Sequence, residues 1–397
     1  MIRRLVFWAS AGLVAFTYVG APLLILVRAA ARPRPVRAAP IEPSVSIVIA
    51  ARNEAASIGA RLSNLAALDY PPDRLEVIVA SDGSEDRTVE IARGASAEDG
   101  RVTILDLDRV GKADALNAAV ERATGDVVVF TDANSAFAPD AVRALVRPLA
   151  DPEVGGVAGN QVYTAEAGEA HGTGERDYWN FDRKMKRAES AAGSTVSATG
   201  AIYALRRELV PTIVAGVTDD FYTSTAVIDR GRRLVFAEDA IAYEPPAKTT
   251  SREYGRKVRI ISRGFRGVAA RQALLDPRRT GFYAVQLAWH KLLRRLMAAP
   301  VLVMGATSLL LARESRFHAL VALSQLGGYA LAAIGLFAPE SRIGRSRPVA
   351  LGSFFVMVNL ASLHAAINVL RGKRIERWEP TRSAHDGPAA GGGEDAA

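Results

Sequence analysis

The stretch "VSIVIAARNEAASIGARLSNLAAL", residues 45–68, changes its pattern part of the way along. Its first seven residues, Val45 to Ala51, are apolar except for Ser46, as in a strand covered on both faces. From Glu54 onward the apolar residues recur at helical spacing, so a helix follows the strand. A buried strand followed directly by a helix is the repeating unit of an α/β fold with a parallel sheet.

The same unit recurs on the C-terminal side of this stretch. Apolar runs predict strands at Leu75 to Ser81, Arg101 to Leu107 and Asp126 to Thr131. Helical patterns begin near Asp86 and extend from Lys112 to Ala123. The sequence therefore predicts a Rossmann-like, mostly parallel sheet flanked by helices, with right-handed crossovers.

Polar residues follow each predicted strand, and in such a sheet these positions share the edge where ligands bind. They are Arg52 to Glu54, Ser81 to Asp86, Asp108 to Lys112, and Asp132 to Asn134. Any one of these segments is an ordinary turn, but four together indicate a site for a phosphorylated, metal-associated ligand. The chain has neither a G-x-G-x-x-G after its first strand nor a complete P-loop, so neither common nucleotide motif explains the site.

Four uncharged stretches indicate a membrane protein. They are Leu5 to Val27, Leu296 to Ala312, His318 to Pro339 and Val349 to Leu370, and a membrane-crossing helix needs roughly 20 such residues. The second is short. The first has too long an apolar core for a cleaved signal peptide, so we expect a retained anchor. Transmembrane helices are therefore expected at both ends of the α/β region.

Composition narrows the classes of partner. The chain has 397 residues, a net charge of +8 and no cysteine, which excludes disulfides and thiolate metal sites. A basic balance suits a membrane surface or a phosphorylated substrate, and no recognition motif supports nucleic-acid binding. We expect an anchor at 1–38, a catalytic domain at 39–275, membrane helices at 276–375 and a polar, disordered tail at 376–397.

Several motifs, taken in order and spacing, resemble the core of family 2 glycosyltransferases with the GT-A fold. They are "VSIVIAARNEAASI", "VIVASDGSEDRT", "GKADALNAA", "VVVFTDANS", "ATGAIYALRREL" and "TDDFYTSTAVIDRGRRLVF". With the flanking apolar helices, the chain resembles the membrane-embedded synthases of cellulose, chitin, hyaluronan and poly-N-acetylglucosamine. The resemblance implies an inverting enzyme that transfers a sugar from a nucleotide-sugar, expected to be UDP-linked, to a growing glycan or lipid-linked acceptor of a surface polysaccharide.

The resemblance also assigns roles to single residues. Asp220 matches the catalytic base, and Asp219 beside it is expected to raise the pKa of Asp220 by like charge. A helix N-cap, with Thr218 or Asp219 as the capping residue, is the structural alternative. The residues matched to nucleotide-sugar binding are Ala51, Asn53, Glu54, Asp82, Lys112, Asp132, Arg256 and Arg259.

Two motifs depart from the family pattern. The Asp-x-Asp metal motif reads Asp132 and Asn134, so Mg²⁺ or Mn²⁺ would depend on oxygens of the diphosphate, unless the segment only ends a strand and caps a helix. In place of Gln-x-x-Arg-Trp the chain has Arg256, Arg259 and Ile260. Isoleucine lacks the stacking face of tryptophan, which puts long-chain processivity in doubt and favours single additions. Arg256 either clamps the diphosphate or lies on the membrane surface with the rest of this basic stretch.

A rival interpretation is an inactive membrane scaffold or glycan-binding subunit, against which the intact Asp82, Asp132 and Asp220 argue. For the enzyme we expect a bacterial plasma-membrane protein whose catalytic domain faces the cytoplasm, with accessory export subunits as further candidate partners. The arginines from Arg28 to Arg37 agree with that orientation. Three later spans would leave the basic "RGKRIERW" (371–378) outside. Either Leu296 to Ala312 does not cross fully, or "FYAVQLAWH" (282–290) re-enters.

Overall fold

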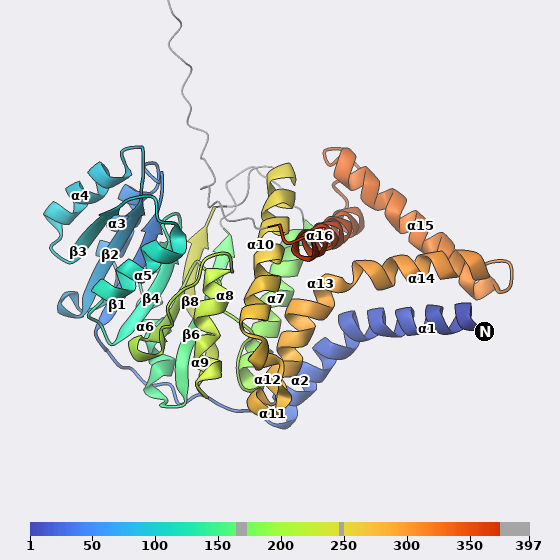
Figure 1. Ribbon diagram of the computed structural model, residues 1–397, viewed down its shortest axis with the longest axis horizontal. Coiled ribbons are helices and arrows are strands. Elements are labelled where there is room, and N and C mark those ends of the chain that lie inside the picture. Colours follow the sequence, from blue (N-terminus) through green and yellow to red (C-terminus); the bar gives the residue numbers. More distant parts are fainter. Residues whose placement is uncertain (164–172, 246–249, 374–397) are drawn as a thin grey trace, which may run out of the picture.

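The computed structural model describes residues 1–163, 173–245 and 250–373. Figure 1 shows a sheet domain on one side and a group of long helices on the other. The expected tail at 376–397 lies outside the described residues.

The first half of the sheet is parallel. Its strands are β1 (Val45–Ala51), β2 (Leu75–Asp82), β3 (Val102–Leu107) and β4 (Val127–Asp132). They lie in the order β3-β2-β1-β4. The crossovers contain α3 (Ile58–Ala66), α4 (Thr88–Glu98) and α5 (Lys112–Arg122). Each predicted strand is therefore present with bounds within one residue of the prediction.

The second half of the sheet is mixed. Its strands are β7 (Tyr203–Arg206), β6 (Val154–Tyr163), β8 (Arg233–Glu244) and β5 (Ala136–Phe137), continuing from β4 in that order. β7 is antiparallel to both β4 and β6, whereas β6 and β8 are parallel. The whole is the mostly parallel, helix-flanked sheet that the sequence predicted.

Side chains of β1 alternate between two cores, one on each face of the sheet. Ile47 and Ile49 pack with α3, α4 and α6 (Ala141–Val146). Val48 and Ala50 pack with α5 and α9 (Ala226–Asp229) on the opposite face. Burial on both faces explains the near-continuous apolar runs of the parallel strands.

Helices at both ends of the chain meet the requirements of a membrane span, as predicted. The N-terminal helix comprises α1 (Ile2–Ala15), a π-helical turn (Phe16–Gly20) and α2 (Ala21–Ala31). Near the other end come α14 (Ala298–Leu311), α15 (Arg316–Phe337) and α16 (Arg347–Leu370). By length and composition, the described residues offer three candidate spans, or four if Phe282–Leu296 and α14, which meet at a 50° bend, count as one broken span.

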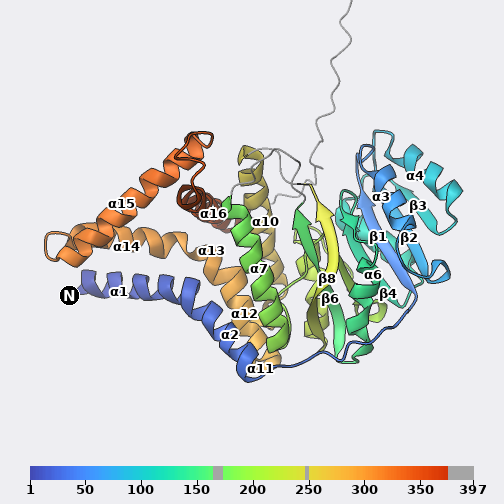
Figure 2. The ribbon, with the colours of Figure 1, turned by 180° about the vertical axis from the view of Figure 1, so that it is seen from behind.

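Two long helices join the sheet to this group. α7 (Thr173–Ala192) lies between β8 and α2, and α10 (Thr250–Ala270) lies along α16. Figure 2 shows both helices between the sheet and the membrane helices. α10, which the sequence suggested as an interfacial helix, has its apolar residues Val258 and Ile261 buried against α16.

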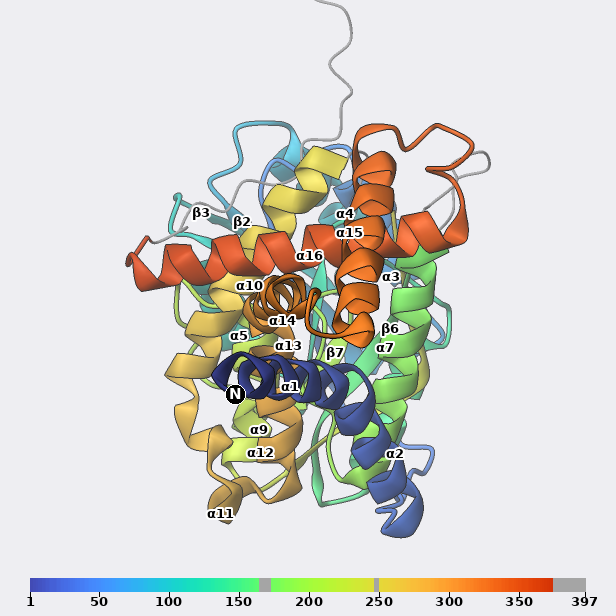
Figure 3. The ribbon, with the colours of Figure 1, turned by 90° about the vertical axis from the view of Figure 1, so that its right-hand side faces the viewer.

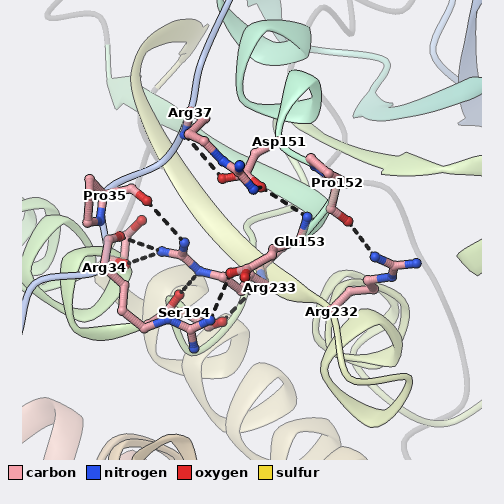
Figure 4. Close-up of polar contacts among 12 residues, drawn as sticks. Arg34, Pro35, Arg37, Asp151, Pro152, Glu153, Ser194, Arg232 and Arg233 are labelled. Atoms are coloured by element: carbon pink, nitrogen blue, oxygen red, sulfur yellow. Dashed lines mark hydrogen bonds and ion pairs between the residues drawn. The ribbon is translucent and has the colours of Figure 1, made fainter.

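Arg233 fixes the linker between α2 and the sheet. Its guanidinium donates to the carbonyl oxygens of Arg34 (2.8 Å), Pro35 (3.4 Å) and Gly193 (2.7 Å), as Figure 4 shows in part. The backbone N–H of Arg37 donates to Asp151 (3.1 Å) a few residues further on. The N-terminal apolar helix is thus attached to the sheet through polar contacts of its linker.

Candidate active site

The candidate site lies where β1 has a parallel neighbour on each side. Asp132 is the last residue of β4 and is aligned with Ala50 of β1. The helix that follows β1 (α3) and the helix that leads into β4 (α5) lie on opposite faces of the sheet, and such a point is where open α/β sheets bind ligands.

Lys112 bridges two carboxylates at this edge. Its Nζ lies 3.0 Å from Asp132 Oδ1 and 3.0 Å from Asp219 Oδ2. Lys112 begins α5 directly after Gly111, whose φ of 100° favours glycine. Asp219 begins α8 (Asp219–Ser224). The first residues of α5 and α8 therefore meet at the end of β4, where the Lys112 ammonium group contacts Asp132 and Asp219.

The two neighbouring aspartates have opposite pKa shifts. Burial raises the pKa of Asp219, but the Lys112 charge outweighs burial and holds that pKa below its usual value. Burial and, next, the negative charge of Asp219 raise the pKa of Asp220 to about 6, although Lys291 and Lys112 oppose the increase. Asp219 thus remains ionised, and Asp220 titrates close to neutral pH, the range that suits a general base.

The structure also bears on the capping alternatives. Thr218 occupies the N-cap position of α8 without a side-chain capping bond, while Asp220 Oδ1 accepts a hydrogen bond from the Phe221 N–H (2.6 Å). The N-cap of α6 is Asp140, so neither Asp132 nor Asn134 caps that helix.

The first two loops at this edge are held together by their own polar groups. Asn53, which has a φ of 51°, accepts a hydrogen bond from the Glu85 N–H through Oδ1 (2.8 Å). The Glu54 N–H donates to Thr88 Oγ1 (2.7 Å). Ala51, the last residue of β1, is fully buried. Asn53 and Ala51 therefore shape the loop, whereas the Glu54 carboxylate is close enough to Asp132 for their charges to interact.

Asp82 links the second loop to the third. Only 1% of Asp82 is exposed. Its Oδ1 accepts a hydrogen bond from the Gly111 N–H (2.7 Å), and its Oδ2 lies 4.0 Å from Arg52. Asp82 thereby positions the start of α5, and with it Lys112.

The proposed cation site has one carboxylate with room beside it. A Cβ on Gly200 would lie 2.9 Å from Asp132 Oδ2, so glycine leaves this oxygen accessible. Asn134 is exposed in the turn that follows. Among the described residues no group of three or more His, Cys, Asp or Glu side chains is placed to hold a metal ion. Asp132 therefore fits a cation only if other ligands come from a bound molecule.

Three further charged residues face the site, and the sequence analysis did not place them there. Arg61 of α3 is buried, donates to Thr131 Oγ1 (2.9 Å) and lies 4.1 Å from the centre of the Phe137 ring. Glu244 ends β8 and accepts from Ser135 Oγ (2.9 Å), and burial together with Asp132 raises its pKa to about 7. Neither residue lies in a recognisable motif.

Arg263 of α10 is the third such residue. The sequence assigned it to a basic membrane surface, but its charge lies close enough to Asp219 to lower the pKa of that carboxyl. Arg256, Arg259 and Arg263 are separated by three and then four residues, which places them on one face of a helix, so this spacing was available as a signal. The positive charge of Arg256 likewise lowers the pKa of Glu244, so Arg256 lies near the Glu244 carboxyl at the edge of the site. Ile260 is 36% exposed.

Comparison with known proteins gives independent evidence about the family of the chain. A profile described as "Glycosyl transferase family 2" matches residues 46–214. An N-acetylglucosaminyltransferase of Rhizobium meliloti is 31% identical over 210 residues, which are 52% of this chain and 47% of that protein. Glycosyltransferase AglE of Haloferax volcanii is 30% identical over 210 residues, 51% of this chain and 67% of that protein.

Two more relatives extend the comparison. A poly-beta-1,6-N-acetyl-D-glucosamine synthase of Staphylococcus aureus is 24% identical over 54% of this chain and 53% of its own length. AglE apart, the chain spans about half the length of these curated relatives. A solved mannosyltransferase from Pyrobaculum calidifontis, in complex with GDP-mannose and Mn²⁺, has a TM-score of 0.71 and 28% identity over 93% of this chain and 100% of its own.

Proposed function

The chain belongs to glycosyl transferase family 2, and from this premise we propose that it is a membrane-bound inverting transferase that moves a sugar from a nucleotide-sugar to a glycan or lipid-linked acceptor. The donor binds at the carboxyl edge of β1 and β4, and the acceptor approaches from α8 and α10.

One observation carries this proposal. Lys112 holds Asp132 and Asp219 at 3.0 Å each, directly beside Asp220, whose pKa is about 6. Two carboxylates that contact one ammonium group, and beside them a carboxyl that titrates near neutrality, form an arrangement with separate charge-binding and proton-accepting parts. Such pairs of groups with opposed pKa shifts mark acid and base roles in enzymes.

In the proposed reaction, Asp220 accepts the proton of an acceptor hydroxyl. The acceptor oxygen then forms a bond to the anomeric carbon as the bond from that carbon to the diphosphate oxygen breaks, and the nucleoside diphosphate leaves with the bonding electrons. Attack from the face opposite the leaving group inverts the anomeric centre. Asp219 remains ionised on Lys112 and keeps the pKa of Asp220 raised.

The leaving diphosphate needs positive charge. Lys112 and Arg263 are the cations nearest the aspartate pair on α5 and α10. A divalent cation, Mg²⁺ or Mn²⁺, would be held by Asp132, with Asn134 as a neutral oxygen donor, and would neutralise the diphosphate. The proposal for a cation is supported by the accessible Oδ2 of Asp132 beside Gly200.

Two donors are favoured by the relatives. The Rhizobium meliloti relative is an N-acetylglucosaminyltransferase, in line with the expected UDP-sugar, whereas the Pyrobaculum calidifontis structure contains GDP-mannose. For the product we propose single or few additions, because Ile260 offers no aromatic face where the long-chain synthases have tryptophan.

The proposed organisation keeps the anchor at 1–38, the catalytic domain at 39–275, membrane helices at 276–375 and a tail at 376–397. We place the catalytic domain in the cytoplasm, where nucleotide-sugars are made. Accessory export subunits would act with the enzyme on the other side of the membrane.

A donor panel tests the function. Purified membranes that contain the chain are incubated with UDP- and GDP-sugars and with Mg²⁺ or Mn²⁺, and nucleotide release is measured against membranes without the chain. Release from one donor, with dependence on an added acceptor fraction, is the expected result. Absence of release from every donor in the panel, with intact folded protein present, would contradict the proposal.

A further inference from the structure

A network of hydrogen-bonding side chains lies at the ends of β6 and β8, and the proposed reaction uses none of its members. Glu244 Oε1 accepts a hydrogen bond from Ser135 Oγ (2.9 Å), and Glu244 Oε2 accepts one from Gln161 Nε2. Gln161 Nε2 also donates to Tyr163 Oη (3.0 Å). We call Ser135, Gln161, Tyr163 and Glu244 the strand-end cluster. The turn after β4 and the last residues of β6 and β8 thus contribute to one polar cluster.

The register of the sheet places this cluster beyond the end of β4. Ala158 of β6 and Phe130 of β4 both pair with Tyr203 of β7, so they lie at the same level. Two residues further on, β4 ends at Asp132, whereas β6 continues to Tyr163. β8 pairs with β6 up to the last residue of both strands. β6 and β8 therefore extend past the end of β4 by about 10 Å, the length of roughly three strand residues.

The strand-end cluster lies beside the proposed cation ligand. Ser135 follows Asp132 in the same turn, and the charges of Asp132 and Glu244 are close enough to interact. Arg256 of α10 is also close to Glu244. α10 and α7 stand apart on the side of the sheet that faces the apolar helices, as Figure 3 shows. The cluster is therefore bordered by the cation ligand and by the basic helix α10.

The order of the strands indicates which part of the donor reaches this cluster. In the proposed function the nucleotide lies near Asp82 at the end of β2, and the diphosphate lies at Asp132 at the end of β4. β7, β6 and β8 follow β4 in the sheet. The sugar is the next part of a nucleotide-sugar after the diphosphate, so it comes to lie over the ends of these strands.

Asp220 fixes which side of the sugar faces the cluster. The anomeric carbon must lie near Asp220, and the charge of Asp220 is close to Tyr203, the first residue of β7. β6 and β8 are the next strands beyond β7. A sugar ring whose anomeric carbon is near the start of β7 therefore presents its other hydroxyls to Gln161 and Glu244.

The hydrogen-bonding groups of the cluster suit sugar hydroxyls. Each oxygen of a carboxylate can accept two hydrogen bonds, so Glu244 can accept from a hydroxyl while it holds Ser135 and Gln161. Gln161 uses its amide nitrogen on Glu244 and Tyr163, and in the described part of the chain its amide oxygen accepts no hydrogen bond. That oxygen can accept from a second hydroxyl. A site that binds particular hydroxyls rejects sugars that lack or misplace them.

We propose that Glu244 and Gln161 bind hydroxyl groups of the donor sugar and determine which sugar the site accepts. Ser135 and Tyr163 are positioning residues, because they hold these two side chains. This sugar subsite rests on the proposed function, since it takes the donor to be a nucleotide-sugar whose diphosphate lies at Asp132. No motif of the sequence indicated it.

Two other roles for the cluster predict different effects. Glu244 could act only on the cation through Asp132, or the cluster could only hold the turn after β4 against β6 and β8. Loss of either role weakens binding of the whole donor, including its nucleotide. Loss of a contact with the sugar weakens binding of the nucleotide-sugar alone.

Calorimetric titration of the purified full chain, with Mn²⁺ and without acceptor, separates these roles. The probes are UDP with UDP-N-acetylglucosamine and UDP-glucose, and GDP with GDP-mannose and GDP-glucose. Glu244→Gln keeps the shape of its side chain, and Gln161→Met keeps the length. Circular dichroism shows whether each variant is folded, and Gln161→Met decides if Glu244→Gln is not. Glu238→Gln is the matched control on the same strand, because Glu238 pairs with Arg187 at the surface.

Both variants should bind the preferred nucleotide-sugar roughly 10- to 100-fold more weakly, the effect of lost hydrogen bonds to a charged or polar group in a site. Their affinity for the free nucleoside diphosphate should be unchanged. The preference between two sugars on the same nucleotide should shrink as well. Glu238→Gln should change none of these affinities.

Two outcomes would overturn the sugar subsite and leave the proposed function standing. One is an equal loss of affinity for the nucleoside diphosphate in folded variants, which would show that the cluster acts through Asp132 or the fold. The other is unchanged affinity for the nucleotide-sugar. A wild-type chain that binds none of the probes would instead contradict the proposed function itself, and the sugar subsite with it.

Discussion

Lys112 is a mostly buried cation and Arg233 a fully buried one, and they are bound by different kinds of oxygen. Arg233, at the base of the linker, donates to backbone carbonyls of Arg34, Pro35 and Gly193. Lys112, at the edge of the sheet, lies between two carboxylates. Carbonyl oxygens are neutral and fixed in the backbone, whereas carboxylates carry charge and can exchange one cation for another.

The difference separates a structural cation from a functional one. Burial and, next, the charge of Arg34 lower the pKa of Arg233, while Glu153 and Asp151 oppose the decrease and the linker carbonyls accept its hydrogen bonds. In the proposed function the carboxylates around Lys112 have a use beyond binding it, because a diphosphate or a divalent cation would compete for the same charges. The two regions should therefore respond in opposite ways to the loss of the cation.

Substitution of Asp220, in the functional region of this comparison, should have the largest effect on turnover. Asp220→Asn keeps the shape of the side chain and removes the base, so turnover should fall by about 10²- to 10⁴-fold. Nucleotide binding should persist, because Asp220 makes no contact in the proposed donor site. Turnover and nucleotide affinity are measured on the same preparation, with Asp82→Asn as the variant that weakens nucleotide binding first. Near-normal turnover in Asp220→Asn with an inactive Asp219→Asn would move the base by one residue.

Removing each cation tests the comparison itself. Arg233→Met leaves several carbonyls unsatisfied and should lower the free energy of unfolding by about 3 kcal/mol, while turnover per folded molecule is unchanged. Lys112→Met should reduce turnover by roughly 10- to 100-fold, the equivalent of one charged hydrogen bond, and change stability less. Denaturant unfolding in detergent and donor turnover are measured for both. A stability loss in Lys112→Met as large as that in Arg233→Met would show that both cations are structural.

The pH profile should separate the two aspartates. The active form of Asp220 is ionised, and its pKa is about 6, so the rate should fall below pH 6, by about tenfold per pH unit. Asp219→Asn removes the like charge that raises this pKa. The acidic limb of the remaining activity should therefore move to lower pH. An unmoved limb in this variant would mean that another group controls the rate.

Product length should change least. Ile260→Trp restores a stacking face on α10, and an aromatic contact with a sugar contributes about 1 kcal/mol, or roughly fivefold in acceptor retention. Products should lengthen relative to wild type, while Ile260→Leu should leave them unchanged. Sizing by mass spectrometry measures both. Long polymer from the wild-type protein alone would show that processivity does not depend on this position.

Much of the fold could be predicted from local pattern. The first strand was predicted at Val45 to Ala51 and is observed there, because burial on both faces leaves an unbroken apolar run that pattern reading detects. Membrane helices were also evident from hydropathy. The packing of α16 on α10 was not, since the composition of a 24-residue apolar helix does not show which of its residues another helix covers.

The site was predictable where motifs exist and not where only the fold brings residues together. Lys112, Asp132 and Asp219 were selected from separate motifs, and the fold joins them within 3.0 Å. Glu244 lies 112 positions after Asp132 in the sequence and reaches it only because β8 and β5 pair at the sheet edge. Asn53 was also selected from a motif. In the structure its side-chain oxygen accepts a hydrogen bond from the Glu85 N–H of the neighbouring loop.

The central claim is that the carboxylates at the end of β4 are arranged for a bound diphosphate and its cation rather than for the fold. Calorimetric titration of Mn²⁺ into the purified full chain, with and without the nucleoside diphosphate of the preferred donor, tests it most directly. Asp132 has an oxygen beside the open Cβ position of Gly200 and Asn134 adds no charge, so binding should be weak alone and tighter with the nucleotide, and Asp132→Asn should abolish the difference. Equal Mn²⁺ affinity in the presence and absence of nucleotide would contradict the claim.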